Sequence, residues 1–331
     1  MKRILGIDVM RTIAAIAIVW LHAMETGRAT TGWDNIGRFA VPYFTATTTF
    51  LIVFLLGERL KEGKIVCIWG YFKSRFYRIY IPFALWSLIY FIIRFLNASF
   101  FSRENTVFVP KDVLFSGTAH HLWFLPFIFW VSFLTCLLTC FLFRKHLVNI
   151  LIASLFFFIG NIFLFIPGSQ SFFKSFGYSS SLIWKTMPSA IFGIGLALCF
   201  LSGHLRLSYM TKYRQFFLFL WVILVLSCLG GRNYYLENIT GFVSLLFAVS
   251  LCVSQHSKLG VLFINLSKYS YFIYLSHILF VEGVKDILAQ FKISSGVLLS
   301  VFVFVISLFL SAFLAKIIGK LRFGKWLGAD I

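Results

Sequence analysis

The first apolar segment of the chain, residues 6–24, carries three ionisable side chains, Asp8, Arg11 and His22. Insertion into a membrane penalises an Asp or Arg at mid-depth by about 2.5–3.5 kcal/mol, so such groups indicate a function by default. Asp8 lies three residues before Arg11 and can pair with it on a helix. Glu25 lies three residues after His22 and can accept a hydrogen bond that orients the imidazole.

On a helix, Arg11 and His22 lie within about 20° of the same face and roughly 16–17 Å apart along the axis. The segment therefore predicts a charged pair near one membrane face and a titratable base near the other. Histidine suits a general base because its pKa lies near the operating pH. The alternative is that all three groups only reach the two membrane interfaces and do no chemistry.

A basic cluster follows in the stretch YFKSRFYRIYIP, residues 71–82, where Lys73, Arg75 and Arg78 stand close together. Arg75 and Arg78 are three residues apart, and two guanidinium groups on one helix face can clamp a phosphate. A basic loop before a membrane helix is also what topology alone requires, and that alternative stays open.

Two further stretches place histidines beside apolar helices. HHLWFLPFIFW, residues 120–130, opens with two histidines ahead of Trp123, a residue type that often anchors helices at the membrane surface. LSKYSYFIYLSHILF, residues 266–280, places His277 about 12 Å inside a helix that starts near Tyr269. Glu282 is a second ionisable group on that helix. A structural hydrogen bond explains His277 nearly as well as a site does.

The composition indicates an integral membrane protein with many spans. Of its 331 residues, 60% are hydrophobic, 20% are aromatic and only 12% are charged, which is too apolar for a soluble domain. The formal net charge of +19 does not call for nucleic acid, because the basic residues sit in short loops between apolar segments. We expect six free cysteines and no metal site.

The pattern predicts an all-α bundle in one membrane domain, residues 1–331, with no appended soluble domain. A span needs about 20 apolar residues, and about ten such helices are expected. Most Lys and Arg residues fall in the loops on one side, so both termini are predicted to face the cytoplasm. The helices are expected to start near Ile7, Arg38, Ile79, Leu122, Leu147, Ile183, Gln215, Asn238, Tyr269 and Val297.

These stretches, taken in order, resemble the acyltransferase 3 family of polytopic membrane acyltransferases. The family's segments correspond to Arg3 followed by IDVMR and LH in the first helix, RFYR at residues 75–78, HLWFL at 121–125 and YLSH at 274–277. One position departs from the family pattern, because Thr48 and Thr49 stand where Ser and Gly are expected. A lost glycine changes how closely a second helix or a ligand can approach.

The resemblance implies transfer of an acyl group, commonly acetyl, from cytoplasmic acyl-CoA to a hydroxyl of a cell-envelope sugar such as O-antigen or another polysaccharide. The reaction would take place at the extracytoplasmic face of the inner membrane, and acetyl-CoA would be a donor substrate rather than a bound cofactor. A passage would have to join the inner arginines to His22. The implied roles are His22 as base with Glu25 and Asp8 beside the site; Arg11, Lys73, Arg75 and Arg78 for CoA; and His121, Trp123, His277 and Glu282 for the sugar.

Two other classes stay open. A transporter or flippase for a polysaccharide or lipid-linked sugar also uses charges and aromatic cavities inside the membrane, but it needs no arginine pair combined with a histidine at the opposite face. A purely structural subunit leaves Asp8, Arg11 and His22 without a purpose. The acceptor, the length of the acyl group and the oligomeric state cannot be read from this pattern.

Overall fold

The computed structural model describes residues 4–24, 32–101, 110–165, 178–251, 257–291 and 296–329, and within these ranges the regular structure is all helical. In a membrane, a helix satisfies the backbone hydrogen bonds of an apolar segment within the segment itself. The helices before residue 102 are α1 (Leu5–Met24), η1 (Trp33–Gly37), α2 (Ala40–Lys61), α3 (Ile68–Arg75), η2 (Phe76–Tyr80) and α4 (Ile81–Phe101).

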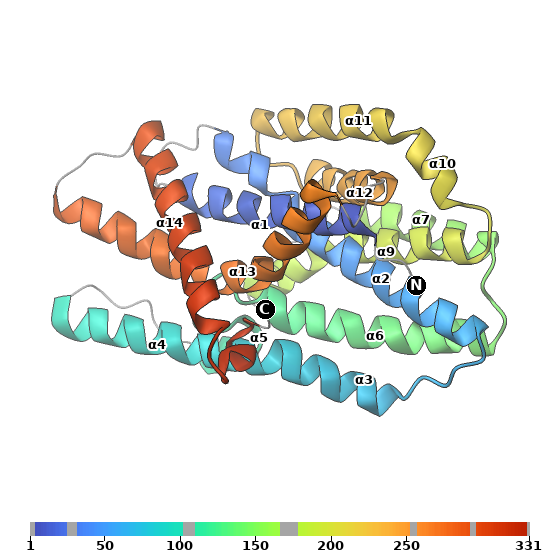
Figure 1. The fold of residues 1–331 in the computed structure, drawn as a ribbon, viewed down its shortest axis with the longest axis horizontal. Helices are drawn as coiled ribbons and strands as arrows, with labels where there is room; N and C mark the ends of the chain where they lie inside the picture. Colours follow the sequence, from blue (N-terminus) through green and yellow to red (C-terminus); the bar gives the residue numbers. More distant parts are fainter. Residues whose placement is uncertain are drawn as a thin grey trace.

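The rest of the described chain continues the bundle. Its helices are α5 (Pro110–Ser116), α6 (Phe124–Arg144), α7 (Ile150–Phe165), α9 (Tyr178–Leu201), α10 (Leu207–Lys212), α11 (Arg214–Ser227), η3 (Cys228–Gly230), α12 (Tyr234–Ser250), α13 (Lys258–Gln290), α14 (Val297–Ile318) and η4 (Gly324–Leu327). In Figure 1, α3 and α4 run along one edge of the bundle, α11 runs along the opposite edge, and α1, α2, α9 and α13 lie between them.

Each predicted helix start falls in a helix or within three residues of one, but two helices begin much earlier than predicted. The third begins at Ile68 rather than near Ile79, and the ninth begins at Lys258 rather than near Tyr269. Side-chain caps explain both starts: Cys67 Sγ accepts a hydrogen bond from Gly70 N, and Ser257 Oγ accepts one from Gly260 N. The basic residues that suggested loops are tolerated because their long side chains reach outward from the helix.

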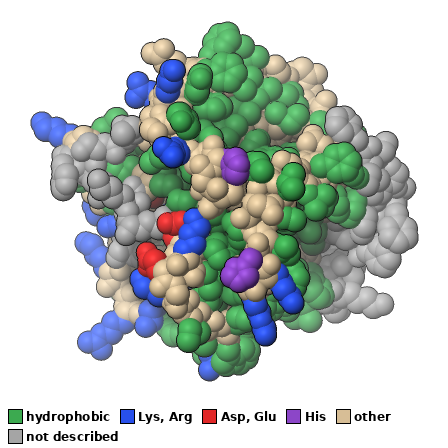
Figure 2. Space-filling view, turned by 90° about the vertical axis from the view of Figure 1, so that its right-hand side faces the viewer, with side chains coloured by type: hydrophobic (Ala, Val, Ile, Leu, Met, Phe, Trp, Pro, Cys, Tyr) green, Lys and Arg blue, Asp and Glu red, His purple; other side chains and the backbone are tan. Residues whose placement is uncertain are grey.

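Six helical segments of the described chain are long and apolar enough to cross a membrane. The prediction of a multi-span helical membrane protein is confirmed at this level, and ten spans stays a prediction. Figure 2 faces the end of the bundle where α2 ends, and it shows Lys and Arg side chains over the left and lower parts of that face. There Lys61 Nζ donates to Leu201 O at 2.7 Å and joins the ends of α2 and α9. This is the end that the sequence predicts to be cytoplasmic.

One buried core joins α1, α2, α4, α6, α9, α12 and α13, and its largest fully buried side chains include Tyr43, Phe50, Phe129 and Phe272. The five cysteines in the described ranges are free thiols, as predicted, and Cys252 lies outside those ranges.

The contact between α2 and α9 is unusually close and bears on the missing glycine. A Cβ atom on Gly193 of α9 would lie 2.2 Å from Ala46 O and 2.3 Å from Thr49 Oγ1. Thr49 Oγ1 donates a hydrogen bond to Ala190 O at 2.9 Å. The glycine at this contact therefore stands on α9, while Thr49 on α2 supplies a hydrogen bond between the helices.

Candidate active site

Four histidines from three parts of the chain meet at one end of α1. His22 lies in the last turn of α1, His120 and His121 lie in the turn before α6, and His277 lies in α13. The nearest approach joins His120 Nε2 and His22 Nδ1 at 3.4 Å. The ring of His22 lies 5.2 Å from that of His277, which lies 5.1 Å from that of His121. Lys285 Nζ donates to His22 O at 2.7 Å and fixes the end of α1 against α13.

Backbone carbonyls face one ring nitrogen of each of the two buried histidines. The Nδ1 atom of His277 lies 2.7 Å from Tyr274 O and 3.1 Å from Ile273 O. Because a carbonyl oxygen only accepts, we assign a hydrogen to this nitrogen. Its Nε2 atom is buried and has no hydrogen-bond partner among the described residues. His121 uses the other nitrogen: its Nε2 faces Leu275 O at 3.4 Å.

Two tyrosines form hydrogen bonds around the histidine turn. Tyr274 OH, from α13, donates to His121 O. Tyr90 OH, from α4, donates to Leu275 O at 2.9 Å and accepts from Leu279 N at 3.2 Å. Tyr274 thus fixes the turn before α6 to α13. Tyr90 joins α4 to α13, and its ring lies 5.4 Å from that of His121. These contacts give the imidazoles defined positions before any substrate binds.

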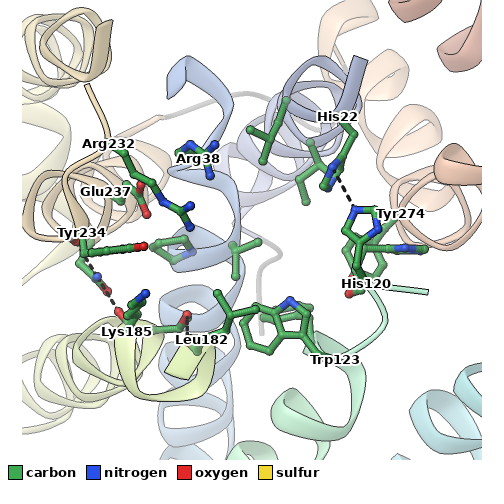
Figure 3. A pocket seen from close by; sticks show the side chains of 18 residues that line it. His22, Arg38, His120, Trp123, Leu182, Lys185, Arg232, Tyr234, Glu237 and Tyr274 are labelled. Carbon is green, nitrogen blue, oxygen red and sulfur yellow. Dashed lines mark hydrogen bonds between the residues drawn. The ribbon is translucent and has the colours of Figure 1, made fainter. Parts of the chain in front are cut away.

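A pocket of about 910 Å³, part of it open to solvent, lies beside His22. Figure 3 shows His22, His120 and Tyr274 on one side of it, Arg232, Glu237, Tyr234 and Lys185 on the other, and Trp123 and Leu182 between them at its base. The remaining described residues of its lining are Ile18, Leu21, Arg38, Val41, Pro42, His121, Phe124, Thr186 and Asn238.

Three cations, Arg38, Lys185 and Arg232, line the pocket, and we call them the cationic wall. Arg38 Nη2 forms an ion pair with buried Asp34 Oδ2 at 2.9 Å. The other two lie against the ring of Tyr234: Lys185 Nζ is 4.0 Å and Arg232 Cζ 4.9 Å from its centroid. The sequence analysis did not predict this wall. The one available signal was Lys185, a charged residue inside a predicted apolar helix.

The only carboxylate among the described lining residues belongs to Glu237, in the first turn of α12. Its Oε1 atom is buried and has no hydrogen-bond partner within the described ranges. The next residue, Asn238, fastens α12 to α9: its Nδ2 donates to Lys185 O at 2.7 Å, and its Oδ1 accepts from Ser189 Oγ at 2.6 Å. These bonds therefore hold the backbone of Lys185 next to that of Glu237.

At the other end of α1, Asp8 and Arg11 pair as their spacing predicts, with 3.7 Å between Asp8 Oδ1 and Arg11 Nη1. Asp8 is 4% exposed and also accepts from Ser267 Oγ at 3.2 Å, which ties α1 to α13. The side chain of Arg11 is 37% exposed and keeps access to a ligand.

The predicted phosphate clamp has a different geometry from a regular helix face. Arg78 lies in η2, a π-helical turn, so Arg75 and Arg78 are not on consecutive turns of a regular α-helix. Arg75 Nε donates to Tyr71 OH at 3.0 Å, and Lys73 Nζ lies 5.4 Å from the centroid of the Trp69 ring. Arg78 is exposed.

The remaining predicted residues divide into four groups. His121 and Trp123 line the pocket, whereas His277 lies behind the rings of His22 and His121. Glu282 is exposed and is not among the described lining residues. Glu25 lies outside the described ranges.

The predicted passage from the inner arginines to His22 is not part of this pocket. Its described lining includes neither Arg11, Arg75 nor Arg78. A connection between the two ends of the bundle stays a prediction.

Comparison with known proteins gives one match that covers nearly the whole chain. The family model described as "Acyltransferase domain" (Acyl_transf_3) matches residues 4–316. A protein named "Amino-acid racemase" from Enterococcus faecalis is 26% identical over 126 residues, which are 37% of this chain. The match spans only 17% of that racemase's length. No solved structure matches the chain.

Proposed function

This chain belongs to the acyltransferase 3 family of membrane proteins, and from that premise we propose that it is an O-acetyltransferase. Acetyl-CoA from the cytoplasm is the donor, and a hydroxyl of a cell-envelope sugar, in O-antigen or another polysaccharide, is the acceptor. The protein works in the inner membrane with both termini in the cytoplasm.

The observation that carries this proposal is the position of His22. Its imidazole lines the pocket and contacts His120, while the Asp8–Arg11 pair occupies the opposite end of the same helix. Arg11 and His22 are eleven residues apart on α1, so they lie roughly 16–17 Å apart along the axis. A donor that is held at the inner end by its phosphates and extends along α1 can present its thioester near His22.

In the proposed reaction, His22 acts as general base. The imidazole takes the proton from the acceptor hydroxyl as the hydroxyl oxygen attacks the thioester carbonyl carbon. The carbon–sulfur bond then breaks, and the thiolate leaves and recovers the proton as free CoA. The products are the acetyl ester of the sugar and CoA, and His22 returns to its starting state.

The remaining side chains position the two substrates. Arg11, Lys73, Arg75 and Arg78 bind CoA phosphates, since guanidinium groups bind phosphate well. Trp123 offers an aromatic surface beside the pocket, on which a sugar ring can stack. His277 supports the rings of His22 and His121 from behind, His121 lines the pocket, and Asp8 balances the charge of Arg11.

The test is transfer of radiolabel from acetyl-CoA to envelope glycan in membranes that contain this chain. The His22→Ala variant should lose the transfer, whereas His204→Ala, a histidine in an exposed loop, should retain it. Both variants are checked for equal amounts of folded, inserted protein. Full activity of His22→Ala would remove His22 from the mechanism, and movement of a sugar substrate without acyl transfer would favour a transporter.

A further inference from the structure

Two members of the cationic wall, Lys185 and Arg232, form no ion pair among the described residues, although the carboxylate of Glu237 lies near both. The ion pairs among the described residues include Arg38 with Asp34 but none for Lys185 or Arg232. Both of these lie against the Tyr234 ring (Figure 3), which attracts a cation but takes up little of its hydrogen-bonding capacity. Their N–H groups are therefore available to a ligand in the pocket.

The charge balance of the described lining favours an anion. Asp34 offsets Arg38 at 2.9 Å, so Lys185 and Arg232 face the single carboxylate of Glu237. That leaves an excess of positive charge beside the cavity. Lys185 is half-buried and Arg232 is exposed. Both can bind an anionic group through charge-assisted hydrogen bonds.

Glu237 adds a second requirement. Its buried Oε1 atom lacks a hydrogen-bond partner among the described residues, and an unpaired buried acceptor is costly. A hydroxyl donor from a ligand would satisfy it. A ligand that carries an acid group and several hydroxyls meets both requirements, and that combination describes an acidic sugar.

We propose that the acceptor is an acidic sugar whose carboxylate or phosphate binds Lys185 and Arg232. One of its hydroxyls donates to Glu237, and another reaches His22 across the pocket. This inference rests on the proposed function and specifies the class of its acceptor. The phosphates of CoA are a poorer fit here, because the described lining lacks Arg11, Arg75 and Arg78.

The experiment measures equilibrium binding to the purified full chain in detergent, with no acetyl-CoA present. The probes are radiolabelled methyl β-D-glucuronide, glucose 1-phosphate and neutral methyl β-D-glucoside. We expect the carboxylate or the phosphate probe to bind about tenfold more tightly than the neutral sugar, which is what one charge-assisted hydrogen bond contributes. Whichever acidic probe binds more tightly identifies the source of the charge.

Matched variants tie the effect to this corner of the pocket. Lys185→Gln and Arg232→Gln should each weaken binding of the acidic probe about tenfold, while Lys185→Arg and Arg232→Lys retain most of it. Lys316→Gln removes an exposed cation of α14 and should change nothing. Equal binding of acidic and neutral sugars, binding of neither acidic probe, or equal losses in all three Gln variants would overturn the proposal.

The result separates this inference from the proposed function. Selective binding of an acidic sugar with no acetyl transfer to any acceptor would support the subsite and reject the O-acetyltransferase. Transfer by a protein that does not prefer acidic sugars would do the reverse.

Discussion

The close contact of α2 with α9 predicts a large effect from adding one methyl group. In Gly193→Ala, the new Cβ atom would start 2.2 Å from Ala46 O and 2.3 Å from Thr49 Oγ1. Non-bonded carbon atoms settle about 3.5–4.0 Å from their neighbours, so α9 must move away from α2 by roughly 1 Å or more. That movement also breaks the hydrogen bond from Thr49 Oγ1 to Ala190 O.

The cost follows from these two changes. Overpacking costs about 1–3 kcal/mol and the lost hydrogen bond about 0.5–1.5 kcal/mol, so together they destabilise the fold by about 1.5–4.5 kcal/mol. For a chain of this length, that corresponds to a decrease in melting temperature of roughly 2–6 °C. The pocket should change too, because α2 contributes Pro42 and α9 contributes Lys185 to its lining.

The matched control is Gly195→Ala, two residues further along α9. There the three atoms nearest to the new Cβ all belong to the ring of Phe157, at 3.1–3.3 Å, and a ring can shift by a few tenths of an ångström. Both variants gain the same helix propensity from alanine, so that gain cancels in the comparison. Thermal unfolding in one detergent at one heating rate, with the KM for the acceptor, measures the difference. An equal melting temperature for the two variants would refute the close helix contact as described.

Three further predictions follow from contacts within the bundle. Asp8→Asn should lower the melting temperature by a few degrees, because it removes the charge that forms the ion pair with Arg11. An unchanged melting temperature with lost activity would instead place Asp8 in the reaction. Arg75→Gln and Arg78→Gln should raise the KM for acetyl-CoA far more than the KM for the acceptor, and equal effects on both would limit these residues to topology. Tyr274→Phe removes the hydroxyl that holds the histidine turn. It should lower kcat about tenfold or more with little change in either KM. An unaltered kcat would show that this hydrogen bond does not position the site.

The positions of the ionisable side chains on α1 could be predicted from the sequence, because they depend on local spacing. The Asp8–Arg11 pair follows from a three-residue separation, and the placement of His22 at the opposite end follows from helix geometry. Helix existence was also predictable, since each apolar segment must be helical. Two helix starts were not, because caps at Cys67 and Ser257 outweigh the charges that suggested loops.

The far side of the pocket could not be predicted in the same way. Arg38, Lys185 and Arg232 come from distant parts of the chain, and only the packing of α2, α9 and α12 brings them together. In a sequence, positive residues near helix ends already have an explanation in topology. The close approach at Gly193 could not be predicted either, because its partner Thr49 lies on another helix and neither segment indicates which helix it packs against.

The hydrogen bonds of His277 restrict how charge can travel in this cluster. Its Nδ1–H is directed at carbonyls of its own helix, at 2.7 and 3.1 Å, in both the neutral and the cationic ring. Nε2 is therefore the only atom of the ring that can gain or lose a hydrogen without disrupting α13. An H⁺ that arrives there from the direction of His22 must depart by the same route. In the reaction proposed above, His277 therefore cannot pass a proton onward through Nδ1, and proton transfer would stay on the pocket side of the cluster.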